Sequence, residues 1–332
     1  MTVCSSTIAN GLRVVSHRMV AVETVSIGVW AHAGTRHERA EVNGIAHMLE
    51  HMAFKGTRRR TARAIAEEIE AVGGHLNAYT SREFTAYYAT VLKGDETLAL
   101  DILSDILQHS VFDKGELERE RAVILQEIGQ ANDTPDDVIF DLFQKTSFPN
   151  QPVGRPILGT IELVRTMPRD ALISYMKEHY VAGRMVVAAA GNLDHDQLVT
   201  AVQEVFSDIA IGVETAQEPA RYTGGEARQS RDLEQDSFSS GFRGRVVFGS
   251  GLLRAVGDVD DSRRRYVFAF ISGGTRGARL SLYDLFFRFV LSRWRSVRGL
   301  CRYRGGRGGD RRSGDLRHPE RACQHHLRPR AQ

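Results

Sequence analysis

The sequence has few cysteines, and none of them form a close pair. Its three cysteines are Cys4, Cys301 and Cys323. This spacing argues against a disulfide framework or a thiolate zinc site and favours a reducing compartment. The sequence also lacks any apolar run that approaches about 18 residues, so no membrane-spanning helix is expected. The N-terminal segment shows no charged region followed by a continuous apolar run, which indicates no secretory signal.

Lysine is absent from the last part of the chain. Residues 243–332 contain 21 arginines and seven acidic residues but no lysine, which gives a charge of about +14. Residues 1–242 contain 23 basic and 34 acidic residues, so the net charge of +3 hides two parts of opposite sign. Residues 302–314, RYRGGRGGDRRSG, are typical of segments that bind single-stranded nucleic acid.

The first 242 residues have the pattern of a folded domain. Hydrophobic residues make up 42% of the whole chain, which is enough to form a core. Apolar spacing and turn residues predict strands at 9–18, 23–34, 75–81, 84–92 and 184–192, and helices at 44–54, 62–74, 94–110, 114–133, 168–180 and 194–209. Because strands and helices do not alternate strictly, this order predicts an α+β fold with layers of sheet and helix.

The segment HMLEH, residues 47–51, contains two histidines and a glutamate within five positions. On a helix, His47 and His51 lie one turn apart on one face, so both imidazoles can reach one ion. Glu50 projects to the same side, in the HxxEH order that reverses HExxH. An amphipathic helix with solvated histidines is the alternative that this segment alone leaves open.

A catalytic zinc ion needs a third protein ligand, and the helix at 114–133 offers two candidates. Glu120 and Glu127 are seven residues apart and therefore lie on one stripe of that helix. They are separated by about 10 Å along the axis, so both cannot bind the same ion directly. One of them is expected to be a ligand, while the other orients a ligating histidine.

These segments together resemble a known family. HMLEHMAFKGT, GGHLNAYTSREFTAYYA, ERERAVILQEI, GRPILGT and AAAGN follow one another in the order and spacing of the pitrilysin-type zinc endopeptidases, the inverzincins. Within that family the chain is most similar to the β-subunits of mitochondrial processing peptidase and their bacterial relatives. The resemblance implies the layered fold of LuxS- and processing-peptidase-type metallopeptidases, and a bacterial cytoplasmic protein is expected.

The resemblance also implies a role for each residue of the motif. His47, His51 and Glu127 match the ligands of one Zn²⁺ per chain. Glu50 matches the catalytic base, and Glu120 matches the carboxylate that supports the ligands. The implied activity is hydrolysis of peptide bonds by a zinc-bound water.

A second implied element is the strand that binds the substrate. Asn77, Ala78 and Tyr79 match an edge strand to which an extended peptide adds, so that backbone hydrogen bonds supply the affinity. The expected partners are therefore peptides or protein presequences, and a homodimer or a heterodimer is compatible with the family. No membrane partner is expected, and nucleic acid is the less favoured partner.

The sequence predicts four regions of different character. They are a catalytic domain at 1–212, a linker at 213–225, the start of a second homologous domain at 226–244 and an arginine-rich tail at 245–332. With one choice of synonymous codons for residues 262–280, the same bases read one nucleotide later encode a segment similar to the second domain of the family. We therefore expect that residues from about 245 onward are encoded out of frame. A catalytically impaired product or a non-enzymatic scaffold of the same fold is the alternative function.

Overall fold

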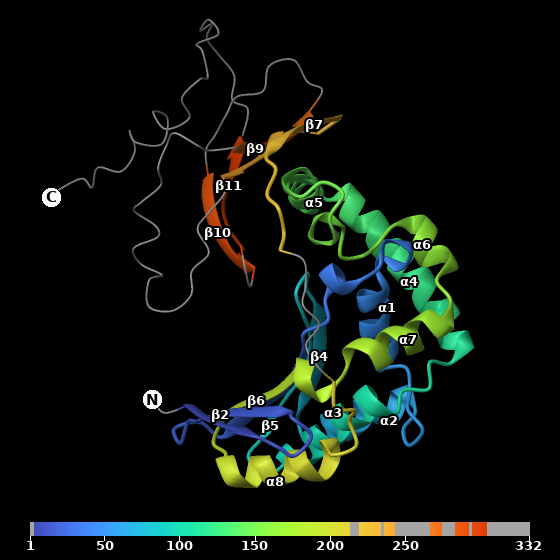
Figure 1. The fold of residues 1–332 in the computed structure, drawn as a ribbon, viewed down its shortest axis with the longest axis vertical. Coiled ribbons are helices and arrows are strands. Elements are labelled where there is room, and N and C mark those ends of the chain that lie inside the picture. The colour runs from blue at the N-terminus through green and yellow to red at the C-terminus, as the bar shows by residue number, and fades with distance from the viewer. Residues whose placement is uncertain are drawn as a thin grey trace, which may run out of the picture.

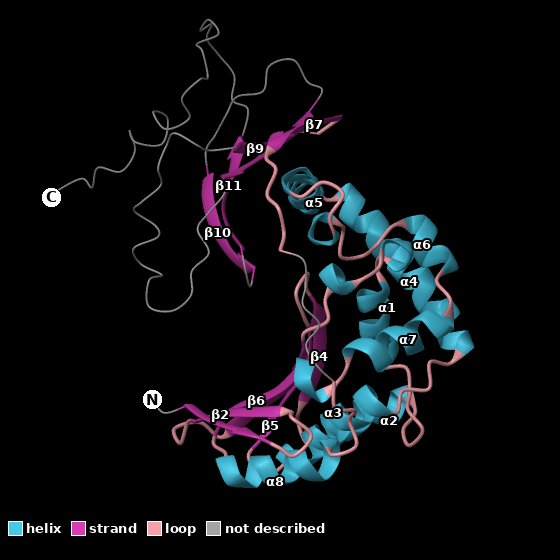
Figure 2. Ribbon diagram, in the orientation of Figure 1, coloured by secondary structure: helices cyan, strands magenta, loops and turns pink. Residues whose placement is uncertain are grey.

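The computed structural model describes residues 3–212, 219–233, 236–242, 266–273, 283–291 and 294–303. Within these residues one β-sheet has helices on one face, and a second β-sheet lies next to helix α5, Pro135–Ser147 (Figure 1 and Figure 2). None of the helices in this part of the chain is long and apolar enough to cross a membrane. Residues 213–218 of the expected linker lie outside the described residues. So do residues 244–249, where the reading frame is expected to change.

The first sheet has six strands in the order β1-β2-β6-β3-β5-β4. Only β2 and β6 run parallel, and every other neighbouring pair is antiparallel. The strands are β1 (Val3–Thr7), β2 (Arg13–Arg18), β3 (Thr24–Ala31), β4 (His75–Thr80), β5 (Thr85–Leu92) and β6 (Met185–Gly191). This order leaves β4 at one edge of the sheet.

The described residues contain eight α-helices, of which α5 contacts the second sheet. They are α1 (Ile45–Ala53), α2 (Ala62–Ala71), α3 (Glu96–Gln108), α4 (Lys114–Asp133), α5 (Pro135–Ser147), α6 (Ile161–Thr166), α7 (Arg169–His179) and α8 (His195–Phe206). Helix α3 contacts β3 and β5, α8 contacts β2, and α1 contacts β4, α4 and α7. Leu100 and Ile102 of α3 are fully buried with Ile27 of β3 in the main core. Met48 and Met52 of α1 are buried in the same core, which holds α1 between β4 and α4.

The second sheet has the order β10-β11-β8-β9-β7 within the described residues. Its strands are β7 (Gly225–Arg231), β8 (Asp236–Phe242), β9 (Tyr266–Gly273), β10 (Tyr283–Leu291) and β11 (Trp294–Tyr303). Helix α5 contacts β7, β8 and β9 of this sheet. Ile139 and Phe143 of α5 are fully buried in a smaller cluster, to which Tyr222 and Leu233 contribute.

Most elements expected for residues 1–212 are confirmed. Helix α4 has the bounds that the sequence predicts, and the hairpin of β4 and β5 pairs His75 with Thr90 and Thr80 with Thr85. The hydroxyl of Thr61 accepts a hydrogen bond from the backbone of Ala64 at 3.1 Å, as expected for a helix N-cap. The α+β class is therefore confirmed, whereas β1, α5 and α6 are elements that the sequence patterns did not indicate.

Candidate metal centre

The helix that carries the two histidines begins at a turn that requires glycine. Gly44 precedes α1 with φ of +96°, a left-handed conformation that favours glycine. A Cβ atom at this position would lie 2.8 Å from the carbonyl oxygen of Leu158. The start of α1 is therefore packed directly against the loop that follows the short 3₁₀ turn Pro152–Gly154.

A buried carboxylate satisfies the first amides of α1. The Glu38 side chain accepts hydrogen bonds from the backbone N–H groups of Gly44 and Ala46, each at 2.9 Å. It also accepts one from Nδ2 of Asn43 at 2.7 Å. Burial raises the pKa of Glu38 to about 7, although these hydrogen bonds oppose the shift. The sequence analysis missed Glu38. The feature that could have indicated it is an acidic residue a few positions before the start of a helix.

The two histidines of the motif lie side by side on α1. Their ring centroids are 4.6 Å apart, and the ring planes meet at 66°. His47 is buried, with 9% of its surface exposed. Desolvation, together with the neighbouring His51, lowers the pKa of His47 to about 4. The imidazole of His47 is therefore neutral at pH 7, which is the form that binds metal ions.

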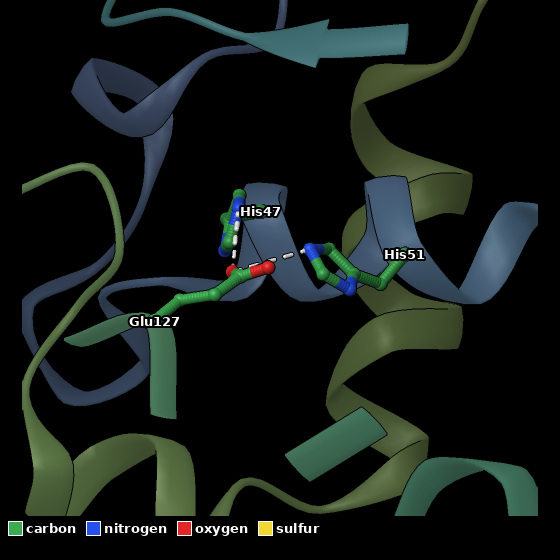
Figure 3. Close-up of side chains that lie close together, drawn as sticks. All are labelled: His47, His51 and Glu127. Atoms are coloured by element: carbon green, nitrogen blue, oxygen red, sulfur yellow. Dashed lines mark ion pairs between the residues drawn. The ribbon is translucent and has the colours of Figure 1, made fainter. Parts of the chain in front are cut away.

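Glu127 of α4 reaches both imidazoles. Its Oε2 lies 3.7 Å from Nε2 of His47 and 3.5 Å from Nε2 of His51 (Figure 3). The three ligand atoms all lie within 4.8 Å of one another. In a tetrahedral zinc site with bonds of about 2.0–2.1 Å, ligand atoms are about 3.4 Å apart. The spacing and the chemistry of this His₂Glu group therefore fit a zinc ion.

Glu120 lies on the other side of His51. Its Oε2 is 2.9 Å from Nδ1 of His51, and its Oε1 is 2.7 Å from the ammonium group of Lys55. Glu120 is buried, with 6% exposed. The two carboxylates of α4 thus meet different nitrogens of one imidazole, as their separation along the helix requires. Lys55 is a further residue that the sequence analysis missed, although it lies only four positions after His51.

Glu50 has an unsatisfied carboxylate oxygen beside this group. Its Oε2 is buried and has no hydrogen-bond partner among the described residues. Burial raises the pKa of Glu50, while hydrogen bonding to Thr80 and the nearby His51 oppose the shift. The hydroxyl of Thr80 also donates to the backbone oxygen of Ala46 at 3.4 Å, which ties β4 to α1.

The edge strand β4 carries the three residues expected to bind substrate. The backbone N–H of Ser81 donates to the oxygen of Phe84 at 2.8 Å. Because hydrogen-bonded and non-hydrogen-bonded pairs alternate in an antiparallel ladder, the N–H of Ala78 faces away from β5. This N–H donates instead to Oδ1 of Asn77 at 2.8 Å. Tyr79 is 43% exposed, and its ring stands edge-on to that of Phe84.

The layered fold and the His₂Glu group with an adjacent glutamate define the class of inverzincin-type metallopeptidase domains. The model of "Insulinase (Peptidase family M16)" matches residues 13–161, and that of "Peptidase M16 inactive domain" matches residues 166–249. The chain belongs to the insulinase family, peptidase family M16.

Named relatives agree with this assignment. The chain is 40% identical to an "Uncharacterized zinc protease" of Rickettsia felis over 83% of this chain and 65% of the relative. It is 46% identical to a "Probable mitochondrial-processing peptidase subunit beta, mitochondrial" of Arabidopsis thaliana over 72% of this chain and 46% of that protein. The chain thus spans about half to two thirds of the length of these relatives.

A solved structure agrees at the level of the fold. The crystal structure of a protease from Helicobacter pylori matches with a TM-score of 0.77 and 17% identity. The match covers 92% of this chain and 75% of that one. At 17% identity, this match supports a shared arrangement of sheets and helices and nothing more.

Proposed function

We propose that this chain is the catalytic part of a zinc-dependent endopeptidase that hydrolyses extended peptides. The observation that carries the proposal is the convergence of His47, His51 and Glu127 from two helices onto one point. The unsatisfied carboxylate of Glu50 on the same helix provides the base that such a reaction needs. A purely structural pair of helices has no use for these four residues in this arrangement.

The ligands and the base have separate roles in this proposal. His47, His51 and Glu127 would hold the zinc ion, which when bound supplies a Lewis acid and lowers the pKa of water. Glu50 accepts a proton from the attacking water and then delivers it to the leaving amine. The raised pKa of Glu50 suits both steps, because the group can bind and release a proton closer to neutral pH.

Strand β4 suits the binding of an extended peptide. The outward N–H and C=O groups of Ala78 would form hydrogen bonds with the backbone of a substrate strand. For this, the N–H of Ala78 must give up its hydrogen bond to Oδ1 of Asn77. Backbone pairing does not demand a particular side chain, so the proposed substrates are peptides and presequence-like segments. The acidic balance of residues 1–242 is compatible with basic peptides, because it would steer them towards the domain.

The proposed organisation is a catalytic domain at 1–212 followed by the beginning of a second homologous domain. A partner subunit is proposed as well, in a homodimer or a heterodimer, because one relative is named as a subunit of a processing peptidase. The cytoplasmic location remains part of the proposal. The competing function is a scaffold of the same fold, and it predicts no hydrolysis at all.

Treatment with a chelator tests this proposal. The purified chain is incubated with a mixture of unstructured peptides, and cleavage is followed by mass spectrometry. Cleavage that stops on chelation and returns with added Zn²⁺ supports the zinc endopeptidase. Cleavage that persists after complete removal of metal excludes the zinc mechanism, and a zinc-loaded chain that cleaves nothing favours the scaffold.

A further inference from the structure

Lys55 lies at the end of a line of contacts that leads to the candidate metal centre. Its ammonium nitrogen is 2.7 Å from Oε1 of Glu120. The other oxygen of Glu120 is 2.9 Å from Nδ1 of His51. Nε2 of the same imidazole is 3.5 Å from Oε2 of Glu127. One cation, two carboxylates and one imidazole therefore form a continuous series.

Hydrogen-bonding capacity fixes the direction of this series. An ammonium group can only donate, so Oε1 of Glu120 accepts from Lys55. The same Glu120 carboxylate accepts a second hydrogen bond through Oε2, and the donor of that bond is the Nδ1–H group of His51. A neutral imidazole with its proton on Nδ1 has a free electron pair on Nε2. Nε2 is the atom that faces Glu127, so this tautomer is the one that can bind a metal ion there.

The backbone holds Lys55 in place for this contact. Its N–H donates to the carbonyl oxygen of Met52 at 3.2 Å, directly after the end of α1. Gly56 follows with φ of +112°, which turns the chain away from the helix. Lys55 therefore extends from the end of the same helix that carries His51. Its side chain is 30% exposed, whereas that of Glu120 is only 8% exposed.

Charge gives the lysine a second effect. The carboxylates of Glu50, Glu120 and Glu127 gather around α1, and Lys55 is a cation that the structure places directly against one of them. A buried carboxylate without such a partner is costly, so Glu120 would turn towards solvent if the ammonium were removed. That movement would also release the imidazole of His51.

We propose that Lys55 is a positioning residue of the metal centre. By holding Glu120 it fixes the orientation and the tautomer of His51, and so it increases the affinity of the His₂Glu group for zinc. The proposal rests on the metal site in the proposed function. It adds a residue that touches neither the ion nor the substrate.

Zinc affinity of the full chain provides the first test, measured by competition with a chromophoric chelator. Lys55→Met is expected to weaken zinc binding on the order of 10-fold, the lower end of the range for residues that orient metal ligands. Lys55→Arg is expected to restore most of the affinity, because a guanidinium also donates only. Lys93→Met, which removes an exposed lysine just after β5, is the matched control and should leave the affinity unchanged.

A double-mutant cycle shows whether Lys55 acts through Glu120. In a Glu120→Gln background the further change Lys55→Met should cost nothing more. An equal loss in both backgrounds would show that the lysine acts by another route and would overturn the proposal. An unchanged affinity of Lys55→Met in the native background would overturn it as well.

The tautomer of His51 can be measured without metal. ¹⁵N NMR of the metal-free chain, with the His51 signals assigned by a His51→Gln variant, should show the proton on Nδ1 in the native chain. In Lys55→Met the two tautomers should mix, and an unchanged spectrum would contradict the proposal. A native chain that binds no zinc but shows this tautomer change would refute the proposed function while supporting the action of Lys55 on His51.

Discussion

At the scale of single residues, three glutamates around α1, Glu38, Glu50 and Glu120, differ because their neighbours differ. Glu38 accepts hydrogen bonds from the first amides of the helix and stabilises its start. Glu120 is held between Lys55 and His51. Glu50 keeps one buried oxygen without a partner, which is an unfavourable arrangement in a resting protein. Unsatisfied groups of this kind are typical of sites where the missing partner is a substrate, a water molecule or an ion.

The role of Glu50 leads to a direct prediction. Glu50→Gln keeps the size and polarity of the side chain but removes the base. We expect kcat/KM for a cleaved peptide to fall by about 10²-fold or more, with zinc content unchanged. Peptide hydrolysis together with metal analysis of the purified variant measures both. Full activity in this variant would show that another group accepts the proton.

Histidines with lowered pKa values predict how stability depends on pH. Desolvation lowers the pKa of His37 to about 2 and that of His179 to about 4, so both stay neutral in the folded state at pH 5. The unfolded chain binds protons at these histidines below pH 6.5, and stability therefore falls as the pH falls from 6.5 towards 4. Glu38, with a pKa raised to about 7, opposes this trend because the folded state takes up one proton as the pH falls.

The net expectation for the metal-free chain is a loss of stability on acidification between pH 6.5 and 4.5. Three histidines with lowered pKa values, His37, His47 and His179, act there against two glutamates with raised pKa values, Glu38 and Glu50. Urea unfolding at pH 7.5, 6.0 and 5.0, with a chelator present, measures the free energy of unfolding. A free energy that rises steadily towards pH 5 would contradict the inferred desolvation of these histidines.

At the scale of elements, the sequence predicted most of what positions the site. Helix α4 was predictable to the residue, because the Asp113 side chain caps it by accepting from Gly115 and Glu116, and Thr134-Pro135 ends it. Strand β1 was not predictable, since VCSST is short, polar and exposed and owes its conformation to pairing with β2. Helix α5 begins at Pro135, directly after α4. Pro135 clearly indicated the end of the preceding helix, but it only weakly indicated that a new helix begins there.

The contacts between elements were the harder part of the site. The spacing of His47, Glu50 and His51 predicts one helix face, and the seven-residue spacing of Glu120 and Glu127 predicts that they differ in role. The approach of Glu38 to the start of α1 and of Lys55 to α4 depends on how loops fold over the sheet. Neither residue lies in a periodic pattern, so no local rule indicates its partner.

Strand β4 gives a prediction that separates substrate binding from folding. Proline removes a backbone N–H, which is tolerated in an edge strand where that N–H does not pair within the sheet. Ala78→Pro is therefore expected to raise KM for peptides strongly, with zinc content and secondary structure retained. Tyr79→Pro is the matched comparison, because the N–H of Tyr79 faces β5 and its loss should unfold the hairpin. Unchanged peptide cleavage by Ala78→Pro would exclude strand addition at this edge.

At the scale of the whole molecule, the first sheet with its helices contains every residue assigned to the metal centre. The second sheet packs against α5, whose buried Ile139 and Phe143 lie in one cluster with Tyr222, and Arg231 of β7 donates to the carbonyl oxygen of Asn132 in α4. The match to the second family model ends at residue 249, close to the position where the sequence analysis places a change of reading frame. If the reading frame changes there, as the sequence analysis expects, the arginine-rich composition that follows is a consequence of the nucleotide sequence.

The reading frame can be tested at the level of the gene. Sequencing both strands across the codons for residues 244–249 should reveal a single inserted or missing nucleotide relative to the frame of the family. We expect the frame-restored chain to cleave peptides faster, because the resemblance to the family implies a complete second domain that encloses the zinc site. An uninterrupted frame on both strands would leave the arginine-rich segment as a genuine part of the protein.

The central claim is that His47, His51 and Glu127 bind one zinc ion between α1 and α4. Anomalous diffraction at the zinc absorption edge, from crystals of the chain grown with zinc, tests it most directly. The account predicts one strong peak about 2.0–2.2 Å from Nε2 of each histidine and from a carboxylate oxygen of Glu127. A zinc-loaded crystal with no peak between these side chains, or with its peak at another group of residues, would contradict it.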